Sequence, residues 1–128
     1  MLASAIYVTS GSSATLDSVR INDLYSPQRC QHENSGIIVG QQGGSISILN
    51  SNFTENDCSY IYSDRTPVQI SNSRFREKCT NSPYIHMKGS VLSITDSIFS
   101  QDSVSFKTLG HGVKCDTCSQ VVIKSSTF

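Results

Sequence analysis

The sequence contains no tryptophan, only three alanines and only three prolines, and both Ile and Val outnumber Leu. Alanine and leucine are strong helix formers, so their scarcity is evidence against a helical protein. The chain has instead 24 Ser, nine Thr and seven Asn, which suit polar turns and, for Thr, strands. Ile, Val, Phe and Tyr recur among them at regular places, unlike in a disordered Ser-rich segment. The composition therefore predicts a folded, β-rich chain.

Excess charge and long apolar segments are also lacking. Ten basic and ten acidic residues cancel within 128, so we expect no surface for nucleic acid or an anionic membrane. Uninterrupted apolar runs reach about four residues, far below the roughly 20 that a transmembrane helix needs. The first residues, MLASAIYV, lack the basic region and the apolar length of a signal peptide. Nucleic-acid binding and membrane insertion are therefore not expected.

A six-residue phrase occurs five times. ILNSNF, ISNSRF, ITDSIF and IKSSTF begin at Ile48, Ile70, Ile94 and Ile123, and a looser copy, LDSVRI, begins at Leu16. The copies step by 32, 22, 24 and 29 residues, so the phrase is constant while the connection varies in length. A structural repeat with loops of unequal length behaves in this way.

Within the phrase, apolar residues two apart indicate a strand with one buried face, as at Ile46 and Ile48. The third position holds a residue that tolerates tight corners, and Ser follows it in four copies. One outward residue then precedes a large apolar residue that returns to the interior. Each phrase therefore predicts a strand, a corner and a second strand.

These features predict an all-β fold, a right-handed parallel β-helix of about five coils stacked in register. An antiparallel sandwich would not need turns in phase with one phrase, and no period-3.6 segment supports a leucine-rich or helical repeat. The stack predicts two buried ladders and one polar corner ladder. The core ladders are Ile48, Ile70, Ile94 and Ile123, and Phe53, Phe75, Phe99 and Phe128; the corner ladder is Asn50, Asn72, Asp96 and Ser125, with amides bonding along the stack.

The repeated NS-x-F corner resembles the right-handed parallel β-helix repeats of secreted and surface proteins. GGSI (Gly43 to Ile46) with FTEN (Phe53 to Asn56) resembles the paired GG-x-I and F-x-x-N repeats of polymorphic outer-membrane, adhesin-like proteins. The full pair occurs once, since FREK and FSQD lack the Asn. The resemblance implies an extracellular or cell-surface β-helix.

The ends of the sequence carry no segment that would cap a solenoid. We therefore expect residues 1–128 to form a single β-helix segment, uncapped at both ends, and to be an excerpt of a longer solenoid. A chain whose ends dock onto other copies of itself is the alternative, since an open strand edge attracts a partner.

Five cysteines in so short a chain suggest an oxidising compartment. Cys58 and Cys79 follow Phe53 and Phe75 closely, so stacking predicts a disulfide between coils, for which Cys30 could compete; packed free thiols are the alternative. Cys115 and Cys118 form a C-x-x-C, for which a local disulfide is favoured over a metal site with His111.

Two further features bear on function. Asn52-Phe53-Thr54 is a glycosylation acceptor, and Asn52 takes the outward slot between corner and core. NSPYIHM followed by GHG (Gly110 to Gly112) resembles polygalacturonase signatures. Such enzymes need paired carboxylates, yet Asp-Asp and Asn-Thr-Asp are absent, and no base partner is evident for His32, His86 or His111.

The sequence thus predicts a non-catalytic structural or adhesive module of a large extracellular surface or filament-forming glycoprotein, without cofactors. Its expected partners are other copies, flanking coils of the same chain and glycans. The alternative is a carbohydrate-binding or polysaccharide-degrading β-helix, which a carboxylate pair within about 10 Å on one outward face would favour. A trimeric tail-fibre segment is a third hypothesis.

Overall fold

The computed structural model describes residues 6–22, 36–54, 59–76, 84–100 and 113–126, and the described part contains strands and turns but no helix. None of these described segments is therefore a helix able to cross a membrane. Three strands recur in each coil except the last, where two are described, and every strand pairs in parallel with its counterparts in neighbouring coils. The chain is a parallel β-helix.

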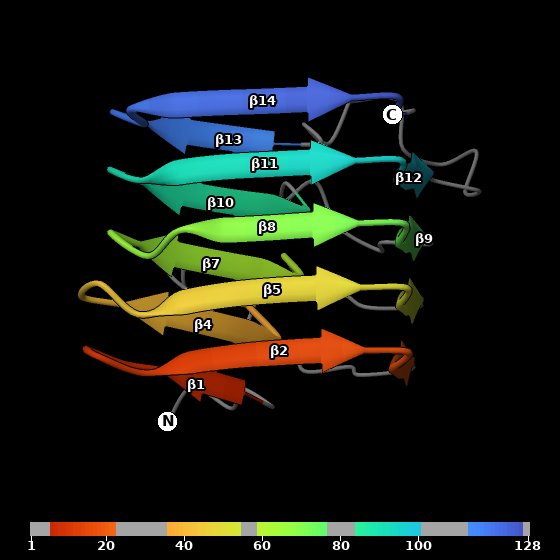
Figure 1. Cartoon of the computed structure of the whole chain (residues 1–128), viewed down its shortest axis with the longest axis horizontal. Helices are drawn as coiled ribbons and strands as arrows, with labels where there is room; N and C mark the ends of the chain where they lie inside the picture. The colour runs from red at the N-terminus through yellow and green to blue at the C-terminus, as the bar shows by residue number, and fades with distance from the viewer. Residues whose placement is uncertain (1–5, 23–35, 55–58, 77–83, 101–112, 127–128) are drawn as a thin grey trace.

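The strands form three sheets, which we name A, B and C (Figure 1). Sheet A contains β1 (Ile6–Val8), β4 (Ile38–Gln41), β7 (Ile61–Asp64), β10 (Ile85–Lys88) and β13 (Val113–Asp116). Sheet B contains β2 (Ser13–Asp17), β5 (Ser45–Leu49), β8 (Val68–Ser71), β11 (Val91–Thr95) and β14 (Gln120–Lys124). Sheet C contains β3 (Arg20–Asn22), β6 (Asn52–Thr54), β9 (Arg74–Arg76) and β12 (Ile98–Ser100).

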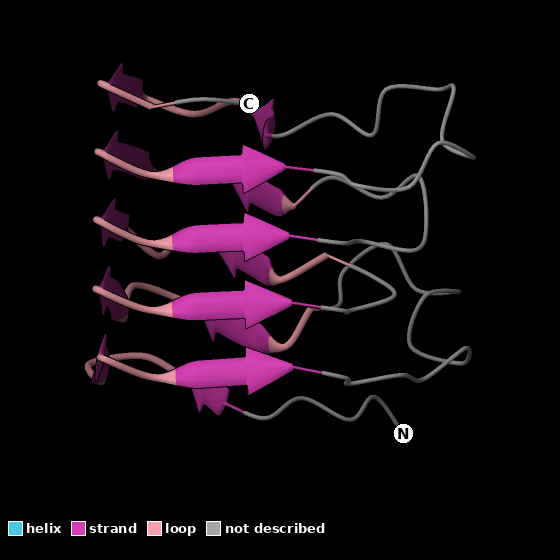
Figure 2. Cartoon of the chain, turned by 90° about the vertical axis from the view of Figure 1, so that its right-hand side faces the viewer, coloured by secondary structure: helices cyan, strands magenta, loops and turns pink. Residues whose placement is uncertain are grey.

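The winding is right-handed. In Figure 1 the chain follows the near strands of sheet B from left to right, returns along the strands behind them and rises toward the C-terminus. Figure 2, turned by 90°, brings the strands of sheet C to the front, stacked one above another along the same axis. This agrees with the strong preference of parallel crossover connections for the right-handed form.

The repeated phrase sets the register. Leu16, Ile48, Ile70, Ile94 and Ile123 are consecutive partners across sheet B, so the first residue of each copy lies over the first residue of the next. Ile21, Phe53, Phe75 and Phe99 are consecutive partners across sheet C in the same way. A shift by one residue would turn every buried side chain outward, which is why this register is strongly specified.

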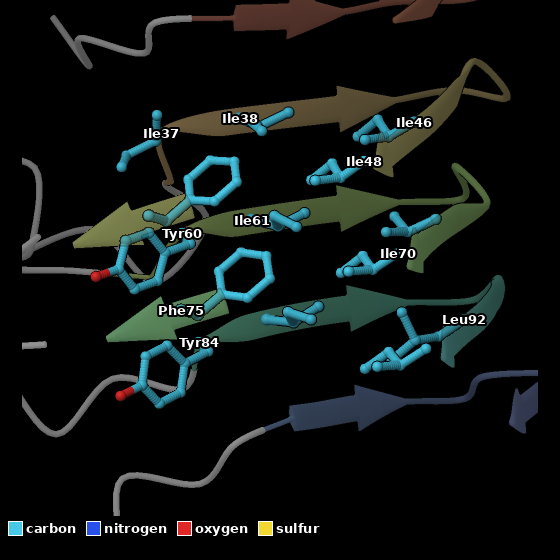
Figure 3. Packing of buried hydrophobic residues seen from close by; sticks show 14 of the residues in the cluster. Ile37, Ile38, Ile46, Ile48, Tyr60, Ile61, Ile70, Phe75, Tyr84 and Leu92 are labelled. Atoms are coloured by element: carbon cyan, nitrogen blue, oxygen red, sulfur yellow. The ribbon is translucent and has the colours of Figure 1, made fainter. Parts of the chain in front are cut away.

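Ladders of identical side chains fill the interior. The rings of Phe53, Phe75 and Phe99 are stacked at 4.7 Å with nearly parallel planes, at 8° and 1°. Tyr60 and Tyr84 form a second stack at 5.5 Å, edge-on to the phenylalanines. Figure 3 shows Tyr60, Phe75 and Tyr84 together, beside the isoleucines of successive coils. The sequence predicted the phenylalanine stack but not the tyrosine stack.

One predicted core position is wrong. Ile123 is in register with Ile94, yet it is 42% exposed, whereas Ile48, Ile70 and Ile94 are all 0% exposed. Val121, on the same face of β14, is likewise 43% exposed. Among the described strands, Ile123 has a neighbour on one side only, β11, because no described strand lies beyond β14. Phe128, the other terminal ladder residue, lies outside the described residues.

Candidate functional site

A polar groove runs along the corner between sheets B and C. We call it the corner groove; it is open to solvent, has a volume of about 260 Å³ and crosses three successive coils. Its lining includes three asparagines, two serines, a guanidinium, a carboxylate and one aliphatic side chain. These residues are Asn50, Ser51, Asn52, Asn72, Ser73, Arg74, Asp96 and Ile98.

The corner residues are held by a special backbone conformation. Asn50, Asn72 and Asp96 have φ angles of 50°, 49° and 50°, and the equivalent Ser18 and Ser125 have 59° and 51°. Asn and Asp are the non-glycine residues that best tolerate this left-handed region. The turn therefore selects the residues that project into the groove, and their side chains are exposed to solvent.

Two amides of the predicted corner ladder are bonded. Asn72 Nδ2 donates to Asn50 Oδ1 at 2.7 Å, and Asn50 Nδ2 donates to Asp17 Oδ1 at 3.1 Å. Every bond in this series points its donor toward the N-terminal coil. Asp17, at the end of β2, was not predicted as a member, because it precedes the corner in its own coil.

The bonded ladder ends at Asn72, although the sequence predicted that it continues through Asp96 and Ser125. Within the described residues, no side-chain bond joins Asp96 to Asn72 or Ser125 to Asp96. A carboxylate accepts hydrogen bonds and has no N–H to donate toward the Asn72 oxygen. Asp96 therefore occupies the slot of an amide without being able to replace it.

A second ladder, of serine hydroxyls, lies beneath the corner. Ser73 Oγ donates to Ser71 O at 3.0 Å and accepts the amide N–H of Ser51 at 3.1 Å. The same pair of bonds recurs at Ser51, Ser97 and Ser126. The serines at positions 51, 73 and 97 are buried. The signal in the sequence was the Ser after the corner residue, but its role was missed.

Asn52 lines the groove from β6, between its register partners Arg20 of β3 and Arg74 of β9. Asn52 as a whole is half-buried, and its Oδ1 atom is enclosed without a hydrogen-bond partner among the described residues. Buried acceptors normally have a donor, so this oxygen is an exception. Glycosylation of Asn52 stays a prediction; the following Phe53 is 0% exposed.

A histidine and a carboxylate meet on the outward face of sheet A. His86 is buried, packs edge-on against Tyr62 with centroids 5.3 Å apart, and places Nε2 3.1 Å from Asp116 Oδ2. The hydrogen bond with His86 lowers the pKa of the Asp116 carboxyl, and the nearby Lys114 and Lys88 act in the same direction. The sequence offered no evident partner for His86, because Asp116 is 30 residues away.

Two carboxylates share one outward row. Lys88 pairs in register with Asp64 on one side and with Asp116 on the other, so the two acids are separated by two strand spacings, about 10 Å. The Asp64 carboxylate also lies 3.3 Å from Nε of Arg65. In the described part of the chain, no three His, Cys, Asp or Glu side chains gather as metal ligands would.

Cys115 in β13 and Cys118 in the turn before β14 form a disulfide, with Cα atoms 5.6 Å apart. The pairing is the local one that the C-x-x-C spacing favoured. Cys30, Cys58 and Cys79 lie outside the described residues, so the predicted bond between coils stays a prediction.

The chain matches no protein-family model, no curated protein and no solved structure, so its function has to be inferred from its own geometry.

Proposed function

We propose that the chain is a non-catalytic structural or adhesive module of a large extracellular surface or filament-forming protein. The single observation that carries this proposal is the repetition of the same positions, in register, through every described coil. Such a stack is a rigid scaffold that presents outward side chains at regular intervals. The surface that we assign to adhesion is the corner groove, because its polar groups come from three coils.

An extracellular location is supported by the Cys115–Cys118 disulfide, since disulfides persist mainly in oxidising compartments.

The glycine pair that carries part of the resemblance to polymorphic outer-membrane, adhesin-like repeats has a structural reason. Gly43 has a φ of 87°, and a Cβ on Gly44 would lie 2.8 Å from the Thr9 carbonyl oxygen. Only glycine suits both positions, one for conformation and one for space.

An adhesion assay tests the proposal. Beads coated with the folded chain are expected to adhere to surfaces coated with polygalacturonate, xylan, chondroitin sulfate or mucin, and to leave the coating intact. Beads coated with albumin are the control. Adhesion no stronger than that of albumin on all four coatings would refute an adhesive role.

A second candidate function, polysaccharide hydrolysis, is favoured by one observation, the row of Asp64, Lys88 and Asp116. Hydrolases that invert configuration hold their two carboxyl groups roughly 6.5–9.5 Å apart. One of the two must act as an acid with a raised pKa, and since the pKa of Asp116 is lowered, Asp116 could act only as the base and Asp64 would have to be the acid. Release of reducing ends from polygalacturonate or xylan that D64N and D116N each abolish would favour the enzyme over the adhesive module.

A further inference from the structure

The corner groove contains oxygen acceptors that the fold does not use. Asn72 Nδ2 donates a hydrogen bond to Asn50 Oδ1, whereas no described group donates to Asn72 Oδ1. No described side chain donates to the Asp96 carboxylate, which lies one coil further along the same groove. The groove is therefore arranged to receive hydrogen-bond donors from a ligand.

The charges of the groove indicate what kind of donor fits. A divalent cation would need several acidic oxygens, whereas the groove offers the single carboxylate of Asp96 with the guanidinium of Arg74 nearby. Hydroxyl groups suit this mixture better, since each one can donate to a carboxylate or amide oxygen and accept from a guanidinium. A polyhydroxylated, uncharged ligand satisfies both sets of groups.

The volume of the groove and its apolar side chain also favour a polyhydroxylated, uncharged ligand. Ile98 is 38% exposed and supplies an aliphatic surface at one side of the polar groups. A volume of about 260 Å³ is below the roughly 300–1,000 Å³ of pockets that enclose drug-sized molecules, so it fits one unit of a chain rather than a large ligand. Successive acceptors are spaced by one coil, about 4.8 Å.

We propose that the corner groove binds a neutral sugar unit of a glycan, with two neighbouring hydroxyls donating to the Asp96 carboxylate and to Asn72 Oδ1. Arg74 donates to an oxygen of the same sugar, and Ile98 contacts its C–H face. This inference rests on the proposed adhesive function and names the ligand class of that surface. It also explains why an acid stands at position 96, where the ladder would be continuous with an amide.

The variant D96N separates ligand binding from folding. The amide nitrogen that it introduces would donate to Asn72 Oδ1 and extend the bonded ladder, so we expect D96N to melt at the same or a higher temperature. The same change removes the charged acceptor and occupies the Asn72 oxygen. Loss of a hydrogen bond to a charged group corresponds to roughly 10- to 100-fold in affinity. A variant that is at least as stable but binds more weakly is not explained by misfolding.

The probes are the methyl glycosides of mannose, galactose, glucose and fucose, detected by saturation-transfer NMR and titrated for Kd. The control is Gln69→Ala, on the outer face of sheet B and outside the corner groove, which should leave Kd and melting temperature unchanged. Weaker binding by D96N, with normal binding by Q69A, would support the proposal.

Two results would overturn it: binding of none of the four glycosides by the parent chain, or equal Kd values for D96N and the parent. If the coated beads still adhere when D96N binds sugar normally, the adhesive function stands and only its location in the groove is refuted. If the chain releases reducing ends from polygalacturonate or xylan, the proposed non-catalytic function is refuted, whatever the Kd of D96N.

Discussion

Phe75→Ala is expected to lower the free energy of unfolding by about 3–5 kcal/mol, the range for truncating a buried aromatic residue. Phe75 is 0% exposed and stands at the centre of the ring stack, with Phe53 and Phe99 each 4.7 Å away and Tyr60 edge-on at 5.5 Å. Its removal leaves a cavity that the hydrogen-bonded coils above and below cannot close. Urea denaturation followed by circular dichroism measures the change.

Arg74→Ala is the matched control for Phe75→Ala. Arg74 is the preceding residue on the same strand, but its side chain is exposed, and surface substitutions usually change stability by no more than about 0.5 kcal/mol. If Phe75→Ala changed stability as little as Arg74→Ala does, the side chain would not be in the core, and the stacked interior would be refuted.

Ser73→Ala is expected to cost about 1–3 kcal/mol, although it removes a single oxygen atom. The loss leaves the Ser51 amide N–H without its partner in a buried environment, and an unsatisfied buried group carries that penalty, whereas the Ser71 carbonyl still accepts the Asn50 amide N–H. The control is Ser47→Ala, a serine on the outer face of sheet B with no such pair of bonds. Equal midpoints for the two variants in urea would contradict the serine ladder.

Much of the fold follows from the sequence because the phrase couples two signals, apolar residues two apart and a corner residue at a constant place. Each copy of the phrase is short and local, so Ile48 over Ile70 and Phe53 over Phe75 could be predicted without knowing the connections. Tyr60 and Tyr84 lie outside the phrase, after connections of unequal length, and their stack could not be aligned from spacing alone.

The site was only partly predictable, and the reasons are physical. The corner amides were identified from residue type, but Asp96 was given the same role, although it lacks the donor that the ladder needs. The serine hydroxyls bond backbone groups 22 to 32 residues away, and backbone partners leave no trace in a side-chain pattern. His86 and Asp116 meet only because β10 and β13 are adjacent.

Stacking of successive phrases in register is the central claim, because the corner groove exists only if Asn50, Asn72 and Asp96 lie one above another. Engineered cysteine pairs on the outer face of sheet B test it directly. Gln69 and Ser93 are register partners, so their Cα atoms should lie about 4.8 Å apart, which permits a disulfide. Gln69 and Thr95 are offset by two residues, roughly 8 Å apart, beyond the usual limit of about 7 Å.

We expect the double variant Gln69→Cys with Ser93→Cys to form its disulfide under mild oxidation, identified by mass after proteolysis so that the five native cysteines do not confuse the assignment. The double variant Gln69→Cys with Thr95→Cys should stay unlinked under the same conditions. Linkage of the offset pair in preference to the partner pair would contradict the register, and with it the ladders and the groove.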